Sequence, residues 1–169
     1  MATLYIMCGI PGSGKSTFAR SHTRHDAPYK ENGGIVHVSR DTIRFHLVKE
    51  DESYFSKEDE VWREFIHQIN HYLEMGFDVM ADATHINTGA RRKLLKEIKV
   101  KDIDLQAMYF DVPISICLER NSKRQGRECV PTSAIKRMYS QFEEPSFEEG
   151  FSTIYTIDSA SGKLEIRRK

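Results

Sequence analysis

The chain has 169 residues, of which 39% are hydrophobic and 30% charged, values typical of one soluble globular domain. Its 25 basic and 25 acidic side chains cancel to a net charge of zero, which disfavours a protein that wraps duplex nucleic acid through a uniformly basic surface. The three cysteines are widely spaced and form no C-x-x-C pair, so they indicate neither a disulfide framework nor a zinc site.

The N-terminal residues and the hydropathy pattern indicate the compartment. No apolar run approaches the roughly 20 residues of a membrane span. Ala2 and Thr3 lead directly into an apolar strand, which is unlike a signal peptide. We therefore expect a single cytoplasmic domain over residues 1–169 without a membrane partner, and the oligomeric state stays open.

Strand and helix patterns alternate along the chain. The predicted strands are residues 3–8, 35–38, 77–84, 103–110 and 151–157, with a short edge strand at 163–167. The predicted helices run from about 14 to 24, through 44–47 after a cap at Ser39 or Asp41, from a Ser56 cap to 75, onward from an Asn87 cap, and over about 113–120 and 131–142. Residues 25–34 and 143–150 are predicted loops.

This alternation predicts an α/β fold with about five parallel strands and helices on both faces of the sheet. Ligands of such sheets bind at the carboxyl ends of the strands. The loop after the first strand, Asp41, Asp82 and Ser159 all follow predicted strands. We therefore expect them to share one edge of the sheet.

Residues 9–17 match the G-x-x-x-x-G-K-[ST] pattern of a nucleoside-triphosphate phosphate loop. A strand before it and a helix after it let backbone N–H groups and a helix N-terminus converge on an anion. Lys15 is predicted to contact the β- and γ-phosphates during catalysis, and the Ser16 hydroxyl to hold Mg²⁺. A purely structural glycine turn is the alternative. The predicted ATP-binding residues here are Gly9, Pro11, Gly12, Ser13, Gly14, Lys15, Ser16 and Thr17.

Asp41 is the predicted catalytic base. Phosphoryl transfer to a hydroxyl needs a carboxylate within hydrogen-bond reach of the acceptor. Asp41 follows the second strand and opens a helix whose N-terminus favours its negative charge, although a helix cap would occupy the same position. Arg44 lies three residues on, on the same helical face, and either binds an anionic acceptor or pairs with Asp41.

Asp82 ends an apolar strand as a Walker B carboxylate does, so it is predicted to order magnesium and its water molecules. A carboxylate in a strand-end turn is the alternative. Thr84 is expected to bond a phosphate or the surroundings of Asp82. We group both residues with Asp41 and Arg44 as acceptor-binding.

A basic stretch over residues 120–127 contains Gly126 between two predicted helices. This pattern predicts a lid, at about residues 120–130, that closes cations over the transferring phosphoryl group. A solvated basic loop is the alternative. The cations of this stretch are Arg120, Lys123, Arg124 and Arg127.

Several short stretches between residues 4 and 142 recur together in one family. They are Gly9–Thr17, Ser39–Asp41 with Arg44, Asp82–Thr84, Phe110–Pro113, Arg120–Arg124, Val130-Pro131 and Arg137–Tyr139. With them the chain resembles the 5′-kinase domain of the phage polynucleotide kinase family. The resemblance implies a P-loop kinase fold that transfers the γ-phosphate of ATP to the 5′-hydroxyl of a nucleic acid.

The resemblance also implies a role for individual residues. Lys15 and Ser16 would bind phosphates and magnesium, and Asp41 would deprotonate the 5′-hydroxyl. Arg44 would hold the 3′-phosphate of the acceptor with support from Asp82. Arg124 would be the lid arginine on the γ-phosphate and therefore catalytic, and Arg120 and Arg124 would both contact ATP. The lid sequence Gln125–Cys129 departs from the family pattern, because it carries an acid and is slightly longer.

The expected cofactors are ATP and Mg²⁺, and the expected acceptor is a 5′-OH nucleic acid end. The alternatives are a small-metabolite kinase with the same base, and a P-loop ATPase or nucleotide-binding module without an acceptor. Asp41 and Arg44 disfavour the last class, because a pure switch needs no acceptor base.

Overall fold

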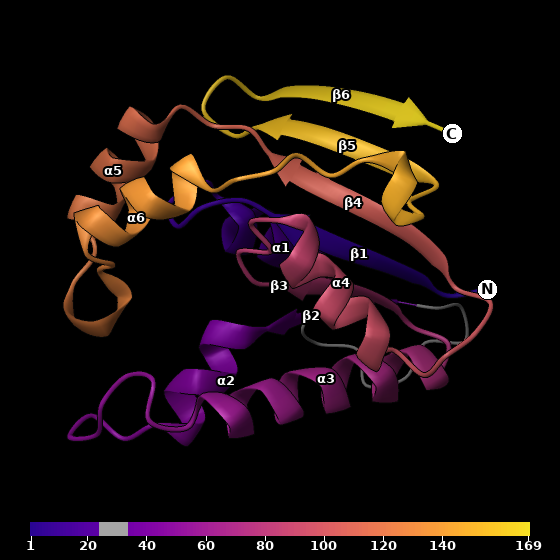
Figure 1. Cartoon of the computed structure of the whole chain (residues 1–169), viewed down its shortest axis with the longest axis horizontal. Coiled ribbons are helices and arrows are strands. Elements are labelled where there is room, and N and C mark those ends of the chain that lie inside the picture. The colour runs from indigo at the N-terminus through magenta and orange to yellow at the C-terminus, as the bar shows by residue number, and fades with distance from the viewer. Residues whose placement is uncertain (24–33) are drawn as a thin grey trace.

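The computed structural model of the chain describes residues 1–23 and 34–169. Its described strands form one sheet in the order β2-β3-β1-β4-β5-β6 (Figure 1). The strands are β1 (Thr3–Cys8), β2 (Ile35–Ser39), β3 (Asp78–Asp82), β4 (Asp104–Phe110), β5 (Thr153–Asp158) and β6 (Lys163–Arg168). The first five are parallel and β6 runs antiparallel to β5. This confirms the predicted parallel sheet and its edge strand.

Six α-helices lie in the described residues: α1 (Lys15–His22), α2 (Arg40–Leu47), α3 (Glu58–Glu74), α4 (Thr88–Glu97), α5 (Ile114–Ser122) and α6 (Thr132–Ser140). Two single 3₁₀ turns, η1 (Gly126–Glu128) and η2 (Phe147–Glu149), lie in the connections. The predicted end of the first helix at residue 24 and most of the predicted loop at 25–34 lie outside the described residues. None of the described helices is both long and apolar enough to cross a membrane.

The helices cover both faces of the sheet. On one face, α3 presents its predicted apolar stripe, which is buried together with Leu94 of α4. The stripe consists of Val61, Phe65, Ile66, Ile69 and Leu73. On the other face, Phe18 and Ala19 of α1 pack on Met7 and Met80. A third cluster joins Cys117 of α5 to Ile135 of α6.

The helix starts select Ser39 from the two caps predicted for the second helix and correct the Ser56 cap predicted for the third. The Ser39 hydroxyl accepts a hydrogen bond from the Thr42 N–H at 3.3 Å, so Ser39 caps α2 and the Asp41 carboxylate is released from that role. Helix α3 begins after Lys57 without a side-chain cap, and not at Ser56. Its first turn carries Glu58, Asp59 and Glu60, whose charges stabilise a helix N-terminus.

Figure 1 shows the consequence for the site. The arrowheads of β4 and β5 point to the end of the sheet where α2, α5 and α6 lie, and the N- and C-terminal labels lie at the opposite end. The carboxyl ends of the parallel strands therefore meet the acidic and basic residues that the sequence singles out.

Candidate active site

The phosphate loop between β1 and α1 fits closely against two distant segments. Gly12 and Gly14 have φ values of 84° and 91°, a region that favours glycine. A Cβ at Gly12 would lie 2.5 Å from the Cys117 carbonyl oxygen, and one at Gly14 would lie 2.9 Å from Ser159 Oγ. Both positions thus require glycine, because their φ values favour it and because a side chain would clash with a neighbouring atom. This fits a loop whose N–H groups bind an anion.

Lys15 is buried inside this loop. Its ammonium donates hydrogen bonds to the carbonyls of Gly9 (2.8 Å) and Ile10 (3.2 Å). Burial lowers the pKa of Lys15, the charges of Asp82 and Asp41 oppose that effect, and the charge of Arg124 adds to it. The predicted base, the strand-end carboxylate and the lid arginine therefore all act electrostatically on one ammonium group.

Asp82 receives two donors on one carboxylate oxygen. The Ser16 hydroxyl donates to Oδ2 at 2.6 Å, and His37 Nε2 lies 2.9 Å from the same oxygen. Burial raises the pKa of Asp82, but the His37 hydrogen bond and the Lys15 charge outweigh burial, so its pKa lies below the usual range. Asp82 is therefore held as a carboxylate beside the hydroxyl that is expected to bind metal.

The pair of Ser16 and Asp82 fits a magnesium ion. Mg²⁺ prefers hard oxygen ligands and is commonly bound by one or two protein groups, with phosphates and water completing its shell. The described residues contain no group of three His, Cys, Asp or Glu side chains that could cage a metal without a nucleotide. Sequence reasoning missed His37; its only signal is one polar residue in the short strand Ile-Val-His-Val.

Asp41 and Arg44 form the second half of the site. Arg44 Nη1 donates to Asp41 Oδ1 at 2.6 Å, and the Asp41 side chain remains 69% exposed. The buried Arg44 guanidinium also donates to both carboxylate oxygens of Glu58 at 2.9 Å. Burial lowers the pKa of Arg44, but Glu58 and Asp41 outweigh it and raise the pKa above its ordinary value. The structure thus shows the pairing of Arg44 with Asp41 and adds Glu58, which the sequence reasoning did not identify.

The predicted lid residues have three different surroundings. Arg120 donates to the carbonyl of Gly12 at 3.2 Å and to Ser159 Oγ at 2.7 Å, and thus ties the phosphate loop to the segment after β5. Arg124 is exposed, whereas the neighbouring Lys123 pairs with Glu119 at 2.7 Å. Arg127 of η1 donates to the Val48 carbonyl after α2 at 2.8 Å.

Thr84 supports the phosphate loop through its main chain. Its carbonyl accepts a hydrogen bond from the Gly9 N–H at 3.0 Å. The next residue, His85, anchors the same turn, because its Nδ1 lies 2.8 Å from the Met7 carbonyl. The segment after β3 is therefore fixed to β1 on both sides of the loop entrance.

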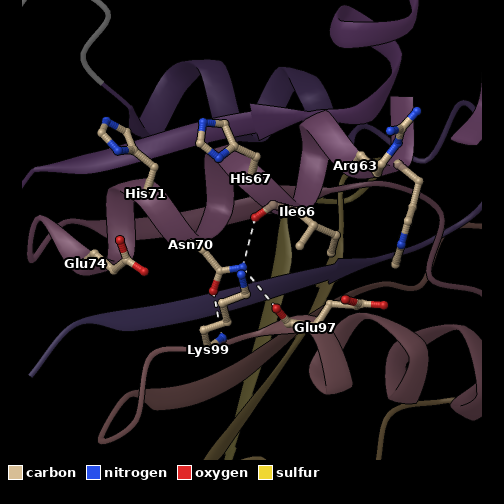
Figure 2. A pocket seen from close by; sticks show the side chains of 9 residues that line it. Arg63, Ile66, His67, Asn70, His71, Glu74, Glu97 and Lys99 are labelled. Atoms are coloured by element: carbon tan, nitrogen blue, oxygen red, sulfur yellow. Dashed lines mark hydrogen bonds between the residues drawn. The ribbon is translucent and has the colours of Figure 1, made fainter. Parts of the chain in front are cut away.

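A separate cavity of about 410 Å³ lies along α3 (Figure 2). The described residues that line this cavity include Trp62, His67 and Lys99. The phosphate loop, Asp41 and Asp82 are not among them. The Asn70 side chain lines this cavity. It donates hydrogen bonds to the carbonyls of Ile66 and Glu97 and accepts one from the Lys99 N–H at 2.7 Å (Figure 2). Its central amide is thus occupied in joining α3 to the end of α4.

Two relatives share most of this chain. The L-seryl-tRNA(Sec) kinase of Methanococcus maripaludis is 31% identical over 147 residues, which are 84% of this chain and 53% of that protein. A putative bifunctional polynucleotide kinase/RNA ligase of Autographa californica nuclear polyhedrosis virus is 25% identical over 152 residues, or 82% of this chain and 20% of that protein. The chain therefore spans about half of the first relative and a fifth of the second.

Solved structures share the fold. A chain of the Pnkp1/Rnl/Hen1 RNA repair complex is 26% identical, with a TM-score of 0.67 over 83% of this chain and 43% of that one. Chaetomium thermophilum Kti12, solved in complex with ADP-AlF3, is 19% identical with a TM-score of 0.64 over 92% and 89% of the two chains.

A family model described as an AAA domain, AAA_33, matches residues 4–145. The match includes the phosphate loop, Asp41, Asp82 and the lid residues. The chain belongs to the AAA_33 family of P-loop kinase domains.

Proposed function

We propose that this protein transfers the γ-phosphate of ATP to the 5′-hydroxyl end of a polynucleotide, with Asp41 as the general base. The observation that carries the proposal is the Asp41 carboxylate. It is exposed, it accepts a hydrogen bond from Arg44, and its charge opposes the lowering of the Lys15 pKa by burial. A carboxylate that can accept the proton of a hydroxyl, at the same edge of the sheet as a phosphate loop, suits transfer to a hydroxyl.

In the proposed reaction, Asp41 accepts the proton of the acceptor hydroxyl. The hydroxyl oxygen then forms a bond to the γ-phosphorus, the bond from that phosphorus to the β–γ bridging oxygen breaks, and ADP leaves with the electron pair. Lys15 and Arg124 offset the negative charge of the phosphates. Ser16 and Asp82 would hold Mg²⁺, which supplies further charge neutralisation at the phosphate oxygens.

Two similarities support a nucleic acid acceptor. The viral relative is a putative polynucleotide kinase/RNA ligase, and the 26% identical structure comes from an RNA repair complex. A second candidate acceptor is the serine hydroxyl of seryl-tRNA, because the archaeal seryl-tRNA(Sec) kinase is the more similar of the two relatives at 31% identity.

The proposed use of ATP and the three free cysteines fit a cytoplasmic location.

The test is an acceptor screen with γ-labelled ATP. The substrates are 5′-OH RNA, 5′-OH DNA, seryl-tRNA and nucleosides, each with and without Mg²⁺. Asp41→Asn is expected to lower transfer about 100-fold or more and to leave ATP binding intact, since general base catalysis contributes about 10²–10⁴. Asp102→Asn is the matched control, because Asp102 is an exposed aspartate outside the site.

Each outcome of the screen separates the candidates. Labelling of 5′-OH ends that depends on Asp41 supports the proposal. Binding of ATP without labelling of any oligonucleotide contradicts it, and labelling of seryl-tRNA alone selects the second candidate. ATP hydrolysis that no acceptor changes would instead indicate an ATPase.

A further inference from the structure

An aromatic group lies beside the Asp41 carboxylate. It consists of Phe45 on α2 and of Tyr54 and Phe55 in the connection to α3. The ring centroids of Phe45 and Tyr54 are 6.1 Å apart, and those of Tyr54 and Phe55 are 4.9 Å apart. The Tyr54 hydroxyl lies 3.4 Å from Asp41 Oδ1, so the group borders the predicted point of proton transfer.

Phe55 is exposed in a way that folding does not explain. It is 67% accessible, the highest fraction among the described large hydrophobic residues apart from Met1. Exposed apolar surface beside polar groups commonly marks a binding site. Tyr54 packs against Phe55, with their rings nearly perpendicular at 87°. The exposed ring is therefore held in place and is available to a ligand.

Two arginines accompany the rings. The Arg44 guanidinium lies 4.9 Å from the Tyr54 centroid and 5.5 Å from that of Phe55. Arg127 of η1 lies 5.2 Å from the Phe45 centroid. Cations over aromatic faces are held by the quadrupole of the ring. The aromatic group thus joins the predicted base to the predicted lid.

The positive charges of Arg44 and Arg127 are neutralised to different extents. Arg44 is matched by Asp41 and Glu58, whereas the hydrogen bonds of Arg127 go to the neutral carbonyls of Val48 and Lys49. Arg127 therefore brings a positive charge to this edge that its hydrogen-bond partners do not cancel. The exposed Phe55 ring and the Arg127 cation, which lies over Phe45, thus belong to one aromatic group. Aromatic side chains and cations together are what proteins use to bind single-stranded nucleic acid.

We propose that Phe55, supported by Tyr54 and Phe45, stacks on a base near the 5′ end of the acceptor strand, and that Arg127 attracts its phosphate backbone. This inference rests on the proposed function. It makes the acceptor a single strand read by base stacking, because every base offers an aromatic face. A small polyol or an acceptor without bases would gain nothing from Phe55.

The experiment measures binding and transfer separately. A 3′-fluorescein RNA octamer with a 5′-OH is bound by wild type, Phe55→Ala and Phe55→Trp and followed by anisotropy, beside phosphorylation with γ-labelled ATP. Phe55→Ala is expected to raise the Kd and the KM for RNA about tenfold. The KM for ATP is expected to stay unchanged, and Phe55→Trp to retain wild-type values. Met75→Ala, at a position that is 55% exposed at the end of α3, is the matched control.

A second RNA substrate, without bases at its first nucleotides, tests whether the loss of binding comes from base stacking. When the first two nucleotides lack bases, wild type is expected to bind as weakly as Phe55→Ala, and the two proteins should not differ. Equal losses for Phe55→Ala on both substrates, or no loss on either, would overturn the stacking role. If binding depends on Phe55 but no end is phosphorylated, the proposed reaction fails and the binding platform stands.

Discussion

His85 has a φ of 42°, an uncommon conformation for a residue with a side chain. Nδ1 is satisfied by Met7, whereas Nε2 is buried without a partner among the described residues. Burial lowers the pKa of His85 to about 4, against the opposing effects of the Met7 hydrogen bond and the Asp82 charge. Lys15 and Arg40 add to the lowering. His85 is therefore neutral in the folded protein at physiological pH.

This burial predicts an acid-sensitive fold. Unfolding restores an ordinary histidine pKa of about 6.5, so the unfolded state binds more protons between pH 6.5 and 4 and stability falls as pH falls through that window. From pH 7 to 5, His85 is expected to cost about 2 kcal/mol of unfolding free energy. Urea titrations should show a smaller loss in His85→Asn, whose amide can replace Nδ1, but not in the exposed control His46→Asn. Equal losses in all three proteins would exclude this role.

Gly12 and Gly76 have nearly equal φ angles, so comparing them separates the effect of backbone conformation from the effect of steric crowding. Gly12 and Gly76 have φ values of 84° and 83°, but only at Gly12 would a Cβ meet another atom within 4 Å. Gly12→Ala is expected to displace the phosphate loop from Cys117 and to weaken ATP binding at least tenfold. Gly76→Ala should lose about 1 kcal/mol of stability and retain ATP affinity. Isothermal titration calorimetry with ATP checks both, and similar affinities in the two variants would contradict the steric account.

At the scale of elements, Arg91 joins α4 to the acidic loop before β5. It is fully buried, and it contacts Glu149 at 2.7 Å and the carbonyls of His85 and Glu143 at 3.0 and 2.9 Å. A guanidinium with several fixed donors suits such a junction, since it bonds both the turn after β3 and the acidic loop before β5. The turn that follows β3 is thereby also bonded to α4.

Arg91→Met is expected to destabilise the fold by about 3–5 kcal/mol, because it leaves Glu149 charged without its partner. The neighbouring Arg92 is exposed, so Arg92→Met should change the free energy of unfolding by less than about 0.5 kcal/mol. Chemical denaturation of both variants provides the measurement. Glu149→Gln in the Arg91→Met background should recover part of the loss, and an unchanged double variant would argue against a buried unpaired charge.

The elements themselves follow from local patterns. Periodicity identifies α3 and its buried stripe, and Asn87 caps α4 as predicted by accepting from the Ala90 N–H at 2.8 Å. The sequence predicts one lid at about residues 120–130, but it does not predict that Arg120 bonds Gly12, 108 residues away, or that Arg127 bonds Val48, 79 residues away. Such partners are set by tertiary packing and leave no local signal. Glu58 and His37 were missed for the same reason.

At the scale of the whole molecule, the phosphate loop gathers contacts from across the chain. Gly9 bonds Thr84 after β3, Gly12 bonds Arg120 of α5, and Ser13 accepts from Ser159 after β5 at 2.8 Å. The shared edge of the sheet was predictable, because strand alternation alone places these loops together. The phosphate loop is therefore hydrogen-bonded to α5 and to the segments that follow β3 and β5.

Nucleotide binding should stabilise the protein as a unit. At an ATP concentration 100 times its Kd, the free energy of unfolding is expected to rise by about 2.7 kcal/mol. Lys15→Met should remove most of this increase, because it deletes the buried cation of the phosphate loop. Thermal unfolding with and without ATP and Mg²⁺ measures both effects. An equal ATP shift in Lys15→Met would show that the nucleotide binds elsewhere.

The strand order also has a consequence for biosynthesis. In the sheet, β1 lies between β3 and β4, which both come later in the chain and are therefore synthesised after it. Such non-local pairing slows folding. As the chain leaves the ribosome, β1 has no adjacent strand until Asp78–Asp82 emerges, and the phosphate loop lacks its Ser159 contact until β5 is complete. Until β3 emerges, the apolar β1 strand is therefore open to chaperones.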